Sequence, residues 1–241
     1  MSHHEFESDF RHSGTIDFTD RQSNIDEATI AEMRQLVARY PDPRSALGPI
    51  LHLIQSVDGR VSARGVELAA ELTGATQAQV VGFVTFYTMY HRRPAGKHHV
   101  GVCTTALCAV MGGDLILDQV EQKLGIKPGQ TTPDGTFSLE RLECNAACDF
   151  APVVMVNWEF MDNMTPDKAE QILDELAAGR SVQSTRGATI TSWREAERVL
   201  AGFPDGRADE GPSVGPASLA GVNLARERGW TADSLAEGSA Q

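Results

Sequence analysis

The chain has 241 residues, of which 41% are hydrophobic, and a formal net charge of −12 at pH 7. This length allows one large domain or two small ones. The negative charge argues against a nucleic-acid binder, which needs a basic face, and against attachment to an anionic membrane surface. The sequence contains neither a secretory signal nor an apolar run of the roughly 18 residues needed to span a bilayer. We therefore expect a cytoplasmic protein without direct membrane insertion, in which thiols stay reduced.

The hydrophobic pattern of residues 1–95 predicts a polar arm followed by helices. Residues 1–25 lack an apolar period, which predicts an extended N-terminal arm. Apolar residues then recur at helical spacing, and turn and cap signals divide them into four short helices. The clearest start is at Thr76, because Gln79 follows three residues later as in a capping box. We expect a small helical bundle over residues 26–95, with the aromatic-rich segment 83–90 forming core and the junction to the next domain.

The periodicity changes after the basic, turn-rich linker at 92–97. Strands are expected at 98–103, 137–143 and 153–157, and 158–161 is expected to pair with the third as a hairpin. A helix is expected after Thr165-Pro166, up to Gly179. One helix is also predicted over 106–124, with these residues available to pack: Val110, Leu115, Leu117, Val120 and Leu124. This order predicts an α/β domain with a four-stranded mixed sheet over residues 96–179, compatible with a thioredoxin-like topology, and an α+β fold class overall.

The last part of the chain, residues 180–241, is dominated by Gly, Ser, Pro, Ala and Arg. Only residues 193–200 offer a short amphipathic helix. Such a composition cannot bury a core of its own. We therefore expect a low-complexity C-terminal extension that is docked on a partner protein.

All four cysteines lie in one stretch as two pairs. Cys103 and Cys108 have four residues between them, and Cys144 and Cys148 have three. Reduced thiols in this number suggest a metal or cluster site rather than disulfides. A dithiol catalyst is disfavoured because neither pair has Cys-x-x-Cys spacing. Structural zinc and a [2Fe–2S] cluster both take four thiolates, and the spacing alone leaves them near parity.

The setting of the first pair favours the cluster. Cys103 ends a predicted strand and Cys108 lies in the first turn of the following helix. Backbone N–H groups between them can therefore point at the sulfurs of an anionic cluster. Thr104 and Thr105 either donate hydroxyl hydrogen bonds to sulfur or serve as ordinary cap residues.

Further similarity to known sequences lies in three stretches: Gly82–Tyr87 with the later Pro94 and Gly96-Lys97, Val102–Cys108, and Glu143–Cys148 followed by Ala151-Pro152. Together, over roughly residues 26–179, they resemble the thioredoxin-like [2Fe–2S] ferredoxin subunit of respiratory complex I, the NADH:quinone oxidoreductase. The ligand pattern of that family, C-x4-C then C-x3-C, falls on the four cysteines. The resemblance therefore implies that one [2Fe–2S] cluster is held by Cys103, Cys108, Cys144 and Cys148.

The resemblance also implies a function and partners. Family members exchange single electrons with a neighbouring subunit that binds FMN and takes hydride from NADH. FMN and NADH are thus expected on that partner, in line with the lack of a G-x-G-x-x-G loop here, and no catalytic residue is expected on this chain. The second implied partner is the iron–sulfur large subunit of the same peripheral arm, on the cytoplasmic side of the cell membrane. Two alternatives stay open: the equivalent subunit of an NAD-linked hydrogenase or formate dehydrogenase diaphorase module, and a non-redox zinc module.

Overall fold

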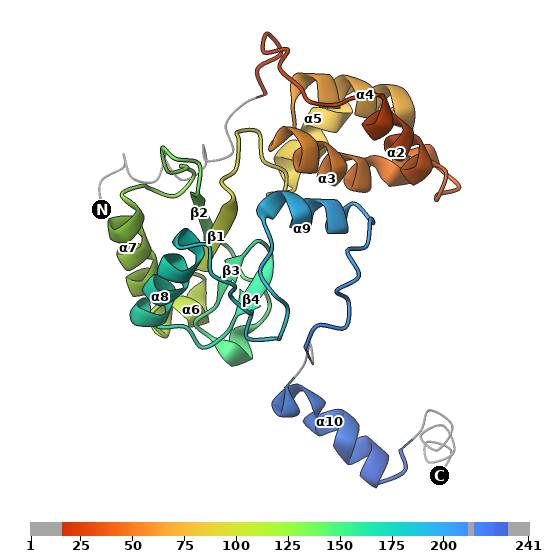
Figure 1. The fold of residues 1–241 in the computed structure, drawn as a ribbon. Coiled ribbons are helices and arrows are strands. Elements are labelled where there is room, and N and C mark those ends of the chain that lie inside the picture. The colour runs from red at the N-terminus through yellow and green to blue at the C-terminus, as the bar shows by residue number, and fades with distance from the viewer. Residues whose placement is uncertain (1–15, 212–214, 231–241) are drawn as a thin grey trace.

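The computed structural model describes residues 16–211 and 215–230, so the first 15 residues of the expected N-terminal arm lie outside the described part. A helical bundle and a mixed α/β domain lie side by side, and a later segment crosses between them (Figure 1). The predicted α+β class with a four-stranded mixed sheet is confirmed.

The bundle begins after Asp26, whose side chain accepts a hydrogen bond from the N–H of Thr29 and so caps the first helix. Its helices are α2 (Glu27–Val37), the 3₁₀ turn η1 (Pro43–Ala46), α3 (Leu47–Asp58), α4 (Ala63–Thr73) and α5 (Gln77–Phe86). The predicted capping box at Thr76 and Gln79 is present, which satisfies the first free N–H groups of α5. Leucine, isoleucine and valine side chains from all four α-helices share one core. Phe86, at the aromatic-rich end, is 77% exposed, whereas Tyr90 is buried against His52 and Phe83.

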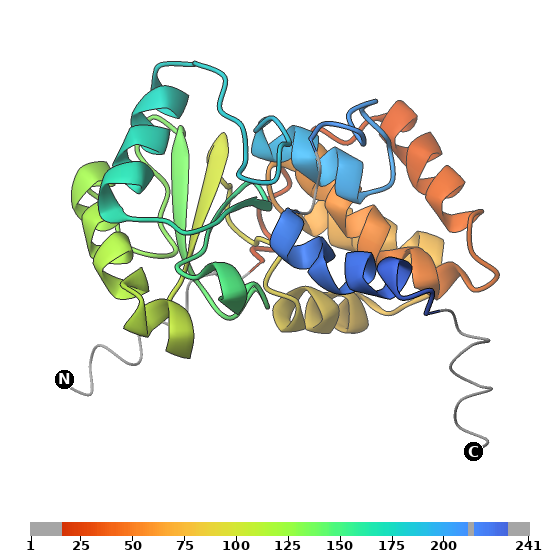
Figure 2. The same cartoon turned by 90° about the horizontal axis from the view of Figure 1, so that it is seen from below.

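The α/β domain is built on a sheet with the order β2-β1-β3-β4. Its elements are β1 (His98–Cys103), α6 (Ala106–Val110), α7 (Gly113–Leu124), β2 (Phe137–Leu142), the 3₁₀ turn η2 (Cys148–Phe150), β3 (Val154–Val156), β4 (Glu159–Met161) and α8 (Pro166–Ala177). β1 and β2 are parallel, whereas β1–β3 and β3–β4 are antiparallel. Figure 2 shows α7 and α8 on one side of the sheet and the bundle on the other. Their apolar faces and the strands enclose the second core.

The helix predicted over 106–124 is wrong as a single element. It breaks between α6 and α7 because Gly112 adopts a φ of 108°, which a residue with a Cβ rarely takes. The break also changes which side chains pack. Leu117 and Val120 are buried as expected, but Val110 is 83% exposed and Leu115 is 65% exposed.

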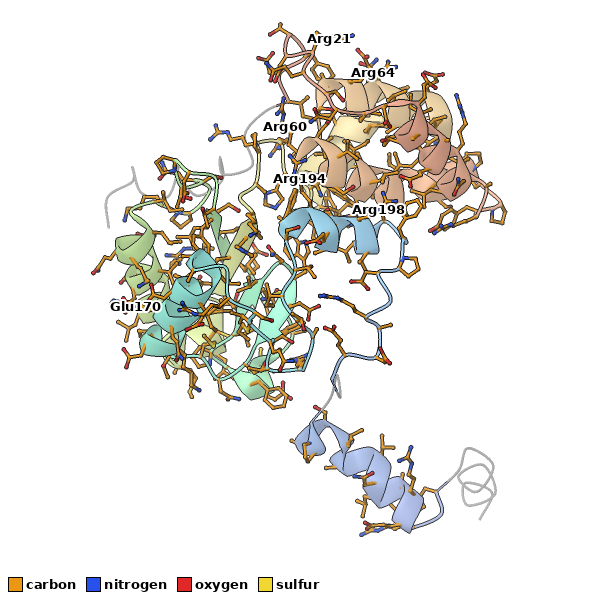
Figure 3. The ribbon with its side chains drawn as sticks, in the orientation of Figure 1. Arg21, Arg60, Arg64, Glu170, Arg194 and Arg198 are labelled. Carbon is orange, nitrogen blue, oxygen red and sulfur yellow. The ribbon has the colours of Figure 1, made fainter. Side chains whose placement is uncertain are left out.

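The expected C-terminal extension needs correction in its first part. Helix α9 (Trp193–Leu200) lies against α3, and the side chain of Trp193 is fully buried. Arg194 donates to the carbonyl oxygen of Val57 at 2.8 Å, and Arg198 forms an ion pair with Glu32 (Figure 3). The buried side chains of Trp193 and Glu197, together with these arginine contacts, hold this short helix on the chain itself.

A second helix, α10 (Pro216–Glu227), was not predicted. It lies apart from the rest of the described chain in Figure 1, and none of its residues is buried. Leu219, Val222 and Leu224 on this helix are exposed, as is Trp230 beyond it. Within residues 16–211 and 215–230, no helix is long and apolar enough to cross a membrane.

Candidate metal centre

The first cysteine pair is held at the end of β1. Cys103 is the last residue of that strand, and Cys108 lies in the first turn of α6. Both side chains are buried, together with Ala147, Ala151 and Val153. The start of α7 closes this corner tightly, because a Cβ atom built on Gly113 would lie 2.5 Å from the carbonyl oxygen of Cys103. The position therefore requires glycine.

The second pair lies in the loop that follows β2. The Sγ atoms of Cys144 and Cys148 are 3.6 Å apart, and both residues are exposed. Ala146 turns the loop with a φ of 54°, and its backbone N–H donates to Sγ of Cys144 at 3.3 Å. A backbone donor at this position stabilises negative charge on the sulfur.

Although the pairs are 36 residues apart in sequence from Cys108 to Cys144, the structure brings them together. Burial raises the pKa of the Cys108 thiol to about 11, with further contributions from Cys103 and Cys148. The pKa of Cys148 is raised chiefly by its hydrogen bond with Cys144 and by the charge of that residue, and Cys103 adds to the effect. A nucleophilic or disulfide-exchanging cysteine needs a lowered pKa. The thiols of Cys108 and Cys148 instead keep their protons until a bound cation replaces those protons.

The arrangement of the sulfurs tests which cation fits. In a tetrahedral Cys₄ zinc site, Zn–S bonds of about 2.3 Å place every two sulfurs about 3.8 Å apart. The Sγ atoms of Cys144 and Cys148, 3.6 Å apart, form one pair at this spacing, and the thiols of Cys103 and Cys108 interact with each other as a second pair. Two pairs of sulfurs can supply two ligands to each of two metal ions, as a [2Fe–2S] cluster requires.

The two threonines between the first pair have separate environments. The hydroxyl oxygen of Thr105 lies 3.8 Å from Sγ of Cys103. The hydroxyl oxygen of Thr104 instead accepts a hydrogen bond from Arg141 at 3.1 Å. The hydroxyl of Thr105 is therefore the one placed beside a cysteine sulfur.

An exposed apolar surface adjoins Cys108 on the same short helix. It is formed by Leu107, Val110, Met111 and Leu115, and we call it the α6–α7 face. The single helix predicted over 106–124 made Val110 and Leu115 available to pack inside the domain. The signal that could have corrected this is the Gly112-Gly113 pair, which predicts a break in the helix.

The fold is that of a thioredoxin-like protein, and the four thiols form a candidate metal or cluster centre. Residues 33–177, which include all four cysteines, match the family described as thioredoxin-like [2Fe-2S] ferredoxin. The chain belongs to this family.

Relatives of known identity extend the match. The chain is 49% identical over 197 residues to a subunit of the NADH-quinone oxidoreductase of Mycobacterium tuberculosis, covering 81% of this chain and 78% of the relative. It is 35% identical over 169 residues to NADH-quinone oxidoreductase subunit 2 of Thermus thermophilus, covering 69% and 89%. The crystal structure of an air-oxidised NAD⁺-reducing [NiFe]-hydrogenase shares the fold, with a TM-score of 0.50 and 16% identity, covering 55% of this chain and 23% of the hydrogenase chain.

Proposed function

We propose that this chain is the electron-transferring [2Fe–2S] subunit of the NADH-oxidising module of an NADH:quinone oxidoreductase. The observation that carries the proposal is the convergence of Cys103, Cys108, Cys144 and Cys148 at one corner of the α/β domain. Membership in a [2Fe–2S] ferredoxin family and the names of the relatives support it.

The cysteines are proposed as the ligands of one cluster, two sulfurs to each iron. Cys144 and Cys148 are close enough to share one iron, and Cys103 and Cys108 are then left for the other. When bound, a [2Fe–2S] cluster supplies a one-electron acceptor. The burial of the first pair excludes water on one side, while the exposed second pair leaves the other side open to a partner.

The partner is proposed to be the subunit that carries FMN and binds NADH. The α6–α7 face offers it exposed leucine, valine and methionine side chains directly beside Cys108. Apolar side chains of this kind are characteristic of the buried centre of an interface. Contact there would bring the cluster close to the flavin, and the chain itself would bind neither FMN nor NADH.

The wider assembly is also part of the proposal. The iron–sulfur large subunit of the peripheral arm is the second expected partner, and α10 with its exposed apolar residues is a candidate contact. Through these subunits the chain would lie at the cytoplasmic side of the cell membrane. Residues 96–179, which we propose as the cluster-binding domain, contain all four proposed ligands.

A second candidate keeps the cluster but changes the assembly. The fold shared with the NAD⁺-reducing hydrogenase favours a diaphorase module of that kind as the alternative. Affinity purification of the native complex separates the two. Membrane subunits and a quinone-reducing activity are expected to co-purify, whereas a nickel-containing hydrogenase subunit in their place would establish the alternative.

The cluster itself is tested on the purified chain. Anaerobic purification should give two irons and two acid-labile sulfides per chain. Serine at each of the four cysteine positions should lower both contents. A chain that holds one zinc and no sulfide would refute the proposal.

A further inference from the structure

Three potential metal-binding side chains meet on the side of the sheet that faces the bundle. His91 lies in the segment that links α5 to β1, His99 is on β1, and Glu140 is on the adjacent strand β2. One donor atom from each of the three lies within 4.8 Å of the other two. Nε2 of His99 and Oε2 of Glu140 are 2.9 Å apart. The proposed electron transfer uses none of these groups.

The two imidazole rings are held in place by their surroundings. Nδ1 of His99 lies 3.0 Å from the hydroxyl oxygen of Ser138, so its other nitrogen is directed towards Glu140. The backbone of His91 donates to the side chain of Gln55 and accepts from the N–H of Val61. The ring of His91 packs edge-on against those of His99 and Trp193. A ring with one nitrogen engaged by a neighbouring oxygen, as at His99, is typical of metal-binding histidines.

The side chain of His91 lacks a partner for one of its ring nitrogens within the described part of the chain. Its Nε2 atom is buried and has no hydrogen-bond partner among the described residues. A buried polar nitrogen without a partner costs about 1–3 kcal/mol. A cation bound at this nitrogen would supply the missing partner.

We propose that His91, His99 and Glu140 form a second metal site, which binds Zn²⁺. Two imidazole nitrogens and one carboxylate oxygen form a ligand set that zinc accepts, with a fourth position left for water. A cavity of about 50 Å³ beside the three residues, lined in part by Thr88, Gln130 and Thr131, has room for that water.

The fit requires a small movement. Zn–N and Zn–O bonds of about 2.1 Å place the ligand atoms of a tetrahedral site about 3.4 Å apart. The ligand atoms here all lie within 4.8 Å of one another. Side-chain rotations that move these atoms by roughly 1 Å would bring them to the tetrahedral spacing. Arg92 and Arg93 line the same cavity, and their charge opposes cation binding, whereas the carboxylate of Glu140 favours it.

The site would connect the two halves of the molecule. Its ligands come from the linker and from both parallel strands of the sheet, so a bound ion would fix the end of the bundle against β1 and β2. The role of the metal ion would therefore be structural. The proposal of this site does not depend on whether the cysteines carry the cluster.

The test uses the full-length, cluster-loaded chain, purified without oxygen, incubated with Zn²⁺ and then desalted. Elemental analysis should find one zinc per chain in addition to the iron, and zinc X-ray absorption should show only N and O ligands at about 2.0–2.1 Å. His91→Gln and His99→Gln should weaken zinc binding at least about tenfold with the iron content unchanged. His98→Gln is the matched control, because His98 precedes His99 on β1 and points to the opposite face of the sheet, towards Phe137.

Three results would overturn the site. One is a wild-type chain with full iron content that retains no zinc. Another is a sulfur shell at about 2.3 Å, which would place the zinc at the cysteines. The third is equal zinc affinity in wild type and His91→Gln. The linker variant decides the question even if His99→Gln does not fold, because His91 lies outside the strands.

Discussion

Nδ1 of His52 lies 2.7 Å from Oε2 of Glu197, which joins α3 of the bundle to α9 from 145 residues further along the chain. Glu197 is completely buried and also accepts hydrogen bonds from the side chains of Gln55, at 2.6 Å, and Trp158, at 2.8 Å. Trp158 belongs to the turn between β3 and β4. One carboxylate therefore links the bundle, the sheet and the C-terminal segment.

Removing this carboxylate should destabilise the whole chain. In Glu197→Ala, the polar side-chain groups of His52, Gln55 and Trp158 lose their partner, and the first two are buried, so the free energy of unfolding should fall by about 3 kcal/mol or more. Urea denaturation measures the loss. Glu195→Ala, on the same helix, is the control and should cost about 1 kcal/mol, because Glu195 only caps the helix start. An equal loss of unfolding free energy in the two variants would show that the buried carboxylate stabilises the fold no more than a helix cap does.

Gly113 should be required for the cysteine corner. In Gly113→Ala the added Cβ meets the backbone of Cys103 and Cys108, which cannot rotate away, so stability should fall by about 1–3 kcal/mol and cluster retention with it. Gly82→Ala is the control, because nothing lies within 4 Å of the Cβ position on α5 and helix propensity favours alanine by about 1 kcal/mol. Iron content after desalting measures retention. Normal iron content in Gly113→Ala would contradict the tight packing described for this corner.

The α6–α7 face should bind the flavin-carrying subunit. A charge placed there by Val110→Asp or Leu115→Asp should weaken the complex by about 1–2 kcal/mol, roughly tenfold in Kd, because a carboxylate would be buried at the interface. The iron content should be unchanged. Tyr40→Asp changes an exposed residue of the bundle and serves as the control. Wild-type affinity in both face variants would place the interface elsewhere.

The final segment should contribute to assembly rather than to folding. Deleting residues 215–241 removes α10, whose residues are all unburied, and should leave the thermal unfolding midpoint within a few degrees of wild type. Deleting from residue 180 also removes Trp193 and Glu197 and should prevent stable folding. If the shorter deletion leaves the native complex intact, α10 is not a docking element.

Acid should weaken the fold through His98. Burial lowers the pKa of His98 to about 4, with a smaller effect of Lys97, and Nδ1 of this ring lies 3.3 Å from the side-chain nitrogen of Asn157, a donor. The unfolded chain therefore binds a proton near pH 6.5 that the folded chain refuses until about pH 4.

A lowered histidine pKa in the folded state makes the protein less stable as the pH falls. Stability from this group is complete above pH 6.5 and falls by up to about 1.4 kcal/mol per pH unit between pH 6.5 and 4. Urea unfolding at pH 7 and pH 5 measures the difference, and His98→Gln should reduce it. An unchanged pH dependence in that variant would exclude His98 as the cause.

Local signals predicted the fold well. The capping box at Thr76, the Thr165-Pro166 start of α8 and the strand predicted over 137–143 all appear at the expected places, because each depends on neighbouring residues alone. The α10 helix carried a weaker signal of the same kind, with Pro216 at its first position and Gly229 beyond its end. That signal was hidden in a segment of low-complexity composition.

Features that join distant segments could not be predicted in this way. The cysteine spacing indicated four ligands but left zinc and iron–sulfur undecided, because the spacing does not give the distances between sulfurs. The His91, His99 and Glu140 group depends on strand pairing and on the path of the linker. The exposure of Val110 depends on the rotation introduced at Gly112.

The central claim is that the four cysteines hold one [2Fe–2S] cluster. Low-temperature electron paramagnetic resonance of the dithionite-reduced full-length chain tests it most directly. We expect a rhombic signal that integrates to about one spin per chain and is lost or altered when Cys144 or Cys148 is replaced by serine. A chain without a paramagnetic signal after full reduction, carrying a metal bound to four sulfurs, would contradict the account.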